Sequence, residues 1–122
     1  MRVAFDIDDT LFKLVEDKDR KEGEMGARCS CGVALKQEPD LLMIDIAHEL
    51  VTGGHSVFLW SAGGVDHAME FIHKHAPAWE GLVKVIPKTS GQDIDVCFDD
   101  QDVDLASVNL RIKREHSDHW GE

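Results

Sequence analysis

The sequence predicts an α/β fold: a three-layer α/β/α, Rossmann-like domain with a parallel sheet of about five strands. Two observations predict this class. Short apolar segments alternate with amphipathic ones along the 122 residues, as in sheets whose parallel strands are joined by helices. Acidic or hydroxyl-bearing residues follow several of the apolar segments, at the strand ends where such folds bind ligands. The length fits one domain, residues 1–122.

Five short apolar segments are predicted to be strands, because most of them are bounded by glycine, proline or acidic residues. They cover residues 2–7, 56–60, 82–86, 94–98 and 107–112. Residues 13–38 interrupt the alternation with mixed charges and glycine, so we expect a surface flap or loop to be inserted after the first strand.

Helices are expected between the predicted strands. Residues 39–51 place apolar side chains at near-helical spacing, with Pro39 suited to the first turn. Residues 65–75 form a second amphipathic segment that ends before Pro77. A third, short helix is predicted at residues 102–106.

The composition of the chain argues against several functional classes. The chain has 13 Lys or Arg and 24 Asp or Glu residues, which gives a formal net charge of −11. This negative charge argues against nonspecific binding to nucleic acid or to an anionic membrane. No apolar stretch approaches the ~18 residues of a membrane span, and the first residues do not resemble a signal peptide. Three cysteines do not suggest a disulfide framework, so a cytoplasmic protein is expected.

Chemistry-bearing side chains follow four of the predicted strands. They lie at or just beyond the strand ends: Asp6, Asp8, Asp9 and Thr10 at the first strand, Ser61 at the second, Lys88 at the third, and Asp99 and Asp100 at the fourth. Because the carboxyl ends of parallel strands lie along one edge of a sheet, these groups can converge. Carboxylates a few ångströms apart repel each other, and a hard divalent cation with oxygen ligands relieves that repulsion.

This order of residues resembles the motifs of the haloacid dehalogenase-like superfamily, most of whose members are Mg²⁺-dependent phosphatases. The most specific part is the apolar strand followed by a D-x-D-x-T pattern at residues 3–11. The later motifs are matched by Ser61, Lys88 and the pair Asp99-Asp100. The resemblance covers residues 1–12 and about 41–110, and it implies a core without a large cap domain.

The resemblance implies hydrolysis of a phosphomonoester through an aspartyl-phosphate, with Mg²⁺ as the cofactor. Asp6 would attack phosphorus, and Asp8 would protonate the leaving oxygen and then activate water, with Ser61 and Lys88 completing the catalytic set. The metal ligands would be Asp6, Asp8 (through its backbone carbonyl), Asp99 and Asp100. The substrate phosphate would be bound by Thr10, Ser61, Ala62 and Lys88.

Three assignments stay open on the residues alone. Lys84 competes with Lys88 for the role of the catalytic lysine, and Lys88 is favoured because it lies just beyond a predicted strand. Asp9 is interpreted as a structural or outer residue of the site. Asp104 either extends the acidic motif from Asp100 or solvates the start of a helix.

The Cys29-x-Cys31 pair raises the question of a zinc site. Structural zinc sites use C-x₂₋₄-C spacing with two further ligands. Here one residue separates the cysteines, and the further ligands would have to be His73 and His75 or His116 and His119. A hairpin or a redox-sensitive flap is therefore favoured over a metal site.

Two rival functions fit part of the pattern. A receiver domain also has acidic residues, a hydroxyl and a lysine, but its lysine follows the last of these motifs, whereas Lys88 precedes Asp99. A catalytically weak regulatory or phosphate-binding protein of the same superfamily is the other alternative, and the intact pair Asp6 and Asp8 argues against it.

The expected partners are phosphorylated substrates. A site without a large cap admits a phosphopeptide as well as a phosphorylated small molecule, and the negative charge makes nucleic acid a less favourable substrate. The flap at residues 13–38, or a second subunit in a homo-oligomer, could close the site over a small substrate.

Overall fold

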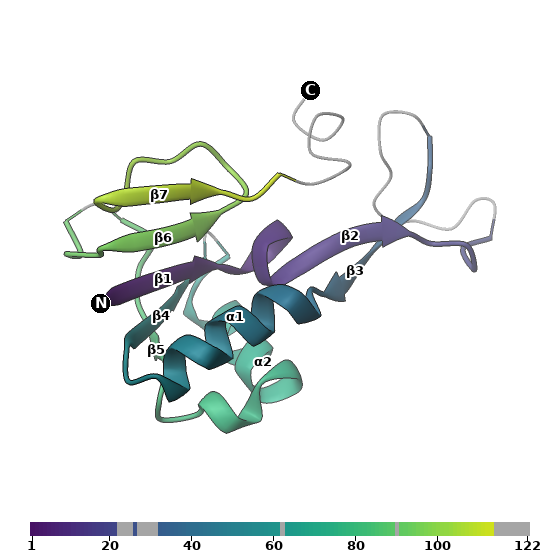
Figure 1. Ribbon diagram of the computed structural model, residues 1–122. Coiled ribbons are helices and arrows are strands. Elements are labelled where there is room, and N and C mark those ends of the chain that lie inside the picture. The colour runs from purple at the N-terminus through teal and green to yellow at the C-terminus, as the bar shows by residue number, and fades with distance from the viewer. Residues whose placement is uncertain (22–25, 27–31, 62, 90, 114–122) are drawn as a thin grey trace.

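The computed structural model describes residues 1–21, 26, 32–61, 63–89 and 91–113. Its centre is a five-stranded parallel sheet in the order β5-β4-β1-β6-β7 (Figure 1). The strands are β1 (Arg2–Asp6), β4 (Ser56–Trp60), β5 (Lys84–Val85), β6 (Val96–Asp99) and β7 (Val108–Arg111). The parallel α/β class is therefore confirmed, although β5 is much shorter than its apolar segment predicts.

Two helices, α1 (Leu41–Thr52) and α2 (Val65–His75), lead into β4 and β5. Their buried side chains share one cluster with Val3 of β1 and Leu59 of β4, so both helices pack on the same face of the sheet. The chain steps in one direction, from β1 to β4 to β5, and right-handed crossovers in one direction place their helices on one face. No helix in the described part of the chain is long and apolar enough to cross a membrane.

Loops rather than helices cover the opposite face of the sheet. Ala4, Phe58 and Cys97 pack there in a cluster that includes partly buried residues from the segments before β6 and β7. The helix expected at 102–106 is not formed, and the side chain of Asn109 instead accepts hydrogen bonds from the backbone in this loop. The three-layer prediction is thus wrong for the described residues, because the segments between β5 and β7 cross this face as irregular chain.

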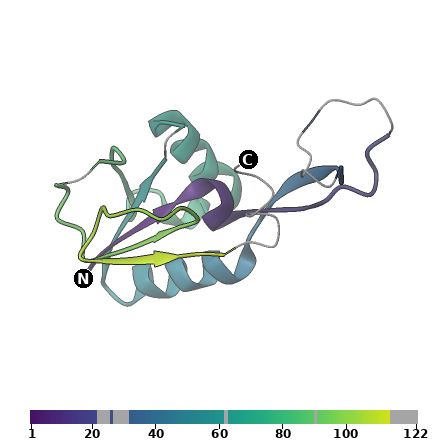
Figure 2. The ribbon, with the colours of Figure 1, turned by 90° about the horizontal axis from the view of Figure 1, so that it is seen from above.

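The insertion after β1 is an antiparallel hairpin at its base. Its strands, β2 (Phe12–Glu16) and β3 (Leu35–Pro39), pair in register and project away from the sheet (Figures 1 and 2). The sequence predicts a flap here, with a hairpin as one interpretation of its cysteine segment, but not the bounds of these two strands. Pro39 ends β3 instead of starting α1, because Asp40 is the helix cap. The side chain of Asp40 accepts hydrogen bonds from the backbone N–H groups of Leu42 and Met43.

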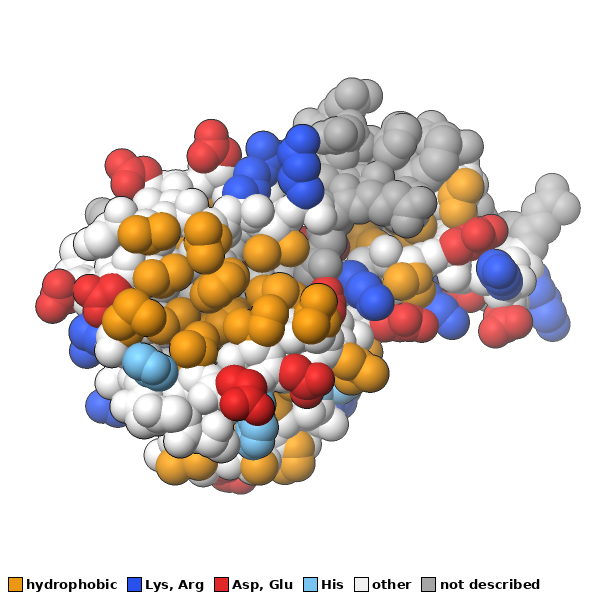
Figure 3. Space-filling model, viewed as in Figure 1, with side chains coloured by type: hydrophobic (Ala, Val, Ile, Leu, Met, Phe, Trp, Pro, Cys, Tyr) orange, Lys and Arg blue, Asp and Glu red, His pale blue; other side chains and the backbone are white. Residues whose placement is uncertain are grey.

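Hydrophobic side chains gather over β6, β7 and the neighbouring flank of α1 (Figure 3). The strand register places Phe98 of β6 and Val108 and Leu110 of β7 on the same face as Phe5 of β1. Phe5 and Phe98 stack with their ring centroids 4.7 Å apart. Because both helices lie over the β1–β4–β5 half of this face, Val108 and Leu110 remain 48% and 43% exposed.

Candidate active site

The end of β1 is shaped by one irregular turn over Ile7–Leu11. The turn is not a regular helix, because Asp8 is extended (φ −67°, ψ 129°) and Asp9 is left-handed (φ 59°). Aspartate is one of the few residues other than glycine that adopts this left-handed conformation readily. As a result Asp6 is buried beside the sheet while Asp8 is exposed on the side of the hairpin.

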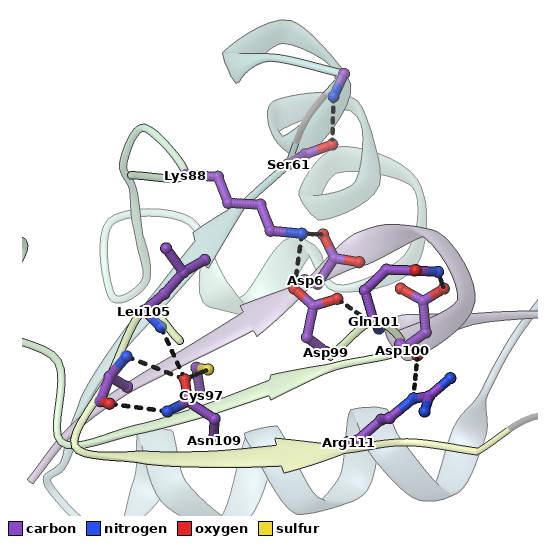
Figure 4. A network of polar contacts seen from close by, with 12 residues as sticks. Asp6, Ser61, Lys88, Cys97, Asp99, Asp100, Gln101, Leu105, Asn109 and Arg111 are labelled. Carbon is purple, nitrogen blue, oxygen red and sulfur yellow. Dashed lines mark hydrogen bonds and ion pairs between the residues drawn. The ribbon is translucent and has the colours of Figure 1, made fainter. Parts of the chain in front are cut away.

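Lys88 joins the ends of two strands. Its Nζ lies 2.6 Å from Oδ2 of Asp99 and donates a hydrogen bond to Oδ1 of Asp6 at 3.2 Å (Figure 4). Lys88 comes from the loop after β5, and Asp99 ends β6 on the other side of β1. The sheet order therefore brings together the three groups that the strand ends predict.

Asp99 and Asp100 are both held by the residue that follows them. The backbone N–H of Gln101 donates to Oδ1 of Asp99, and its side-chain amide donates to Oδ2 of Asp100, each at 2.9 Å. Arg111 of β7 donates to the backbone carbonyl of Asp100 at 3.2 Å. These bonds fix two carboxylates at the C-terminal edge of the sheet, as Figure 4 shows.

Burial and mutual repulsion perturb the acids at this edge. Burial raises the pKa of Asp6 to about 7, and the charge of Asp99 adds to the rise while Lys88 opposes it. Burial also raises the pKa of Asp99, although the hydrogen bond from Lys88 opposes the shift. Burial alone would lower the pKa of Lys88, but its contacts with Asp99 and Asp6 outweigh burial and raise it. One ammonium therefore compensates the carboxylates only in part.

The cluster has the geometry and chemistry of a cation site. One carboxylate oxygen from each of Asp6, Asp99 and Asp100 can be chosen so that all lie within 4.8 Å of one another. Three ionised carboxylates and one lysine leave two negative charges, which a divalent cation would neutralise. All the donors are oxygen atoms, the ligands that Mg²⁺ prefers. The residues present thus fit a hard divalent cation.

The side chain of Asp8 lies outside this carboxylate cluster. Its Oδ1 accepts a hydrogen bond from Nε2 of Gln37, on β3, at 3.1 Å, and Nε2 of His67, on α2, lies 3.0 Å from the same oxygen. Asp8 also lines a cavity of about 550 Å³ under the hairpin, together with Asp9 and Lys36. The structure thus separates the second aspartate of the motif from the first and places it beside open space.

Ser61 is where the sequence predicts it, directly after β4. It is buried, and its Oγ accepts a hydrogen bond from the backbone N–H of Gly63 at 2.9 Å, which shapes the loop into α2. Thr10 is fully buried under the turn. Ala62, expected to contribute to phosphate binding, lies outside the described residues.

The structure shows where the residues lie whose roles the sequence left open. Lys84 begins β5, is exposed, and lines a different cavity with Arg2 and His55, whereas Lys88 reaches the carboxylates. Asp104 is exposed and belongs to an irregular loop rather than to a helix. Cys29, Cys31, His116 and His119 lie outside the described residues.

Sequence reasoning missed three residues at this site, namely Gln37, His67 and Gln101. Gln37 lies in a segment with no clear periodicity, and His67 is a polar residue near the start of an amphipathic helix, so neither carries a motif. Gln101 directly follows the acidic pair, a position from which a side chain readily reaches its neighbours. Of the three residues, only Gln101 could have been predicted from the sequence, because it directly follows the acidic pair.

Comparisons with protein-family models, with curated proteins and with solved structures found no match for this chain.

Proposed function

We propose that this chain is a Mg²⁺-dependent phosphomonoester hydrolase with a haloacid dehalogenase-like core. The observation that carries the proposal is the meeting of Asp6, Lys88 and Asp99 at the C-terminal edge of the sheet. Acidic and basic groups brought together from three strand ends match the needs of phosphoryl transfer, which are a nucleophile and compensation of negative charge. The motif order in the sequence supports the same reaction.

Asp6 is the nucleophile in this proposal. One of its carboxylate oxygens forms a bond to phosphorus as the bond from phosphorus to the leaving oxygen breaks, which gives an aspartyl-phosphate. Mg²⁺ held by Asp6, Asp99 and Asp100 would neutralise charge on the phosphoryl group. Lys88 already donates to Asp6, so it is placed to offset charge on the nucleophile and on a phosphoryl oxygen beside it.

Asp8 is the general acid and then the general base. It gives its carboxyl proton to the leaving oxygen, so the product alcohol departs neutral. Water then attacks phosphorus, its proton passes to Asp8, and the bond from Asp6 to phosphorus breaks to release inorganic phosphate. The exposed position of Asp8 at the cavity wall supports this role, because a leaving group must be able to reach it.

The cavity beside Asp8 supports a small phosphorylated molecule as substrate. Its volume of about 550 Å³ lies within the range of small-molecule sites. Because Asp8 and hairpin residues line it and Asp6 does not, the leaving group would occupy this cavity while the phosphoryl group reaches Asp6. Ser61 lies at the end of β4 with a hydroxyl proton available to a phosphoryl oxygen while its oxygen holds the loop. A phosphopeptide remains the alternative substrate class, and turnover across a panel of small phosphates and phosphopeptides separates the two.

Turnover of p-nitrophenyl phosphate with and without Mg²⁺ tests the proposed function. We expect Mg²⁺-dependent hydrolysis by the wild type and none by Asp6→Asn, which keeps the size of the side chain but removes the nucleophile. Asp45→Asn, an exposed position on α1, is the matched control and should keep full activity. Equal turnover by Asp6→Asn and the wild type would exclude the aspartyl-phosphate mechanism. Mg²⁺-dependent phosphate binding without turnover would instead support the regulatory alternative.

A further inference from the structure

Two elements that are far apart in the sequence meet at the side chain of Asp8. Gln37 approaches from the hairpin and His67 from α2, and both contact Oδ1, at 3.1 and 3.0 Å. The side chain of Asp8 is 51% exposed and that of His67 is 33% exposed, so burial alone does not fix the orientation of this carboxylate. An exposed aspartate without such contacts samples several rotamers. The two contacts are therefore what selects one orientation.

We propose that Gln37 and His67 are positioning residues that hold Asp8 in the orientation needed for proton transfer, an inference that rests on the proposed hydrolase. Among the described residues, the side-chain hydrogen bonds of Asp8 both fall on Oδ1. Oδ1 accepts a hydrogen bond from Gln37, so Oδ2 is the oxygen that this proposal assigns to the proton transfer. The bonds made and broken in the reaction are unchanged by this assignment.

The neighbouring loop supports the ring of His67. A Cβ atom at Gly63 would lie 3.2 Å from Oγ of Ser61 and 3.3 Å from Cδ2 of His67, which is tighter than most real contacts. The loop that follows β4 therefore packs closely between Ser61 and the imidazole. Gln37 is fixed in turn by its strand, where it pairs with Leu14 of β2. Both positioning residues are thus carried by regular secondary structure, Gln37 by β3 and His67 by α2.

The dependence of the rate on the leaving group distinguishes positioning of a general acid from a merely structural role. An alkoxide is a poor leaving group and needs the proton from Asp8, whereas p-nitrophenolate departs without it. The ratio kcat/KM reports the steps up to the first irreversible one, which here is formation of the aspartyl-phosphate. Loss of a positioned acid should therefore lower kcat/KM for an alkyl phosphate selectively, while general damage to the fold lowers it for both esters.

The experiment compares glycerol phosphate with p-nitrophenyl phosphate for His67→Ala, Gln37→Ala and the double variant. Because general acid catalysis contributes about 100- to 10,000-fold, we expect kcat/KM of the double variant to fall about 10-fold or more for the alkyl ester and less than about 2-fold for the aryl ester. His67→Gln, whose side-chain amide can replace the imidazole nitrogen as a hydrogen-bond donor, should restore most of the activity. His73→Ala, an exposed histidine on the same helix, is the matched control.

Two further measurements distinguish a specific loss of activity from unfolding or loss of the metal. Thermal unfolding shows whether each variant is folded. Calorimetric titration with Mg²⁺ should give the wild-type affinity, because the hydrogen bonds of Gln37 and His67 in the described structure fall on the side chain of Asp8, whereas only its backbone carbonyl is expected to bind the cation. Equal losses on both esters, or no loss in the folded double variant, overturn the positioning roles while leaving Asp6 as nucleophile. Activity of Asp6→Asn equal to that of the wild type overturns the proposed function and the positioning roles together.

Discussion

The ammonium nitrogen of Lys88 lies 2.6 Å from Oδ2 of Asp99, a residue with no exposed surface. The two residues belong to segments on opposite sides of β1, so this ion pair closes the C-terminal edge of the sheet over Asp6. Removal of one partner from a buried ion pair leaves the other charge uncompensated, which costs more than the pair itself contributes. Lys88 therefore stabilises the fold of the site as well as any chemistry there.

Replacement of Lys88 by methionine should destabilise the metal-free protein. We expect the free energy of unfolding to fall by about 3 kcal/mol, because Asp99 and Asp6 stay buried without their cation. Lys84→Met, at an exposed position on β5, should change it by less than about 0.5 kcal/mol. Urea unfolding in the presence of a chelator measures both values. An unchanged unfolding free energy for Lys88→Met would show that the ion pair contributes nothing to the fold.

The stability of the metal-free protein should fall as the pH rises. The pKa of Asp6 is raised from 3.8 to about 7 in the folded chain, so the folded state binds this proton more tightly than the unfolded chain does. The free energy of unfolding therefore decreases between about pH 4 and pH 7 and levels off above that range. Asp99 acts in the same direction, because its pKa is also raised. Lys88, whose pKa is also raised, contributes its full stabilisation below the ordinary value of 10.5 and loses it only above that pH.

Thermal unfolding at pH 5 and pH 8 in the presence of a chelator checks this pH dependence. Asp6→Asn should flatten it and should be more stable than the wild type at pH 8, because it removes a charge that burial disfavours. Mg²⁺ should raise the melting temperature more at pH 8 than at pH 5, since it binds the deprotonated carboxylates. A melting temperature that rises from pH 5 to pH 8 without metal would contradict the assigned shift.

The central sheet could be predicted from the sequence because its strands are apolar runs bounded by polar residues. β1, β4 and α2 were placed almost to the residue, and the strand placements put Asp6 and Asp99 at the ends of β1 and β6 and Lys88 just beyond β5. The parallel sheet then explains why these three side chains meet, because the carboxyl ends of its strands lie along one edge. The sequence pattern thus predicts the observed fold correctly for the strands whose apolar side chains are buried in the core.

The bounds of the hairpin strands and the irregular second face could not be predicted, because tertiary contacts decide them. The residues of β3 alternate weakly and are stabilised by pairing with β2, a partner that local sequence does not reveal. Residues 102–106 carry a helix-like pattern, but the amide of Asn109 binds their backbone and favours an irregular loop. The contact of Gln37 with Asp8 depends on the hairpin, so it was hidden for the same reason.

Loss of the cap at the start of α1 should destabilise the protein without a change at the site. Asp40 accepts hydrogen bonds from the backbone N–H groups of Leu42 and Met43, at 3.1 and 3.2 Å. Asp40→Ala should lower the free energy of unfolding by about 1 kcal/mol, while Asp40→Asn, an equally good cap, should change it little. Urea unfolding measures the difference, and kcat/KM should stay at the wild-type value for both. Equal stability of the alanine and asparagine variants would show that the cap is not used.

Removal of the Gln101 side chain should weaken the binding of Mg²⁺. Its amide donates to Oδ2 of Asp100 at 2.9 Å, whereas Asp99 is held by the backbone N–H and keeps that bond in Gln101→Ala. Substitution of groups that orient metal ligands typically costs about 10- to 100-fold in metal affinity, and we expect about 10-fold because only one ligand is released. Gln92→Ala, whose amide bonds Thr89 outside the cluster, is the control. Calorimetric titration at pH 8 gives both affinities, and wild-type affinity in Gln101→Ala would show that Asp100 needs no such support or does not bind the cation.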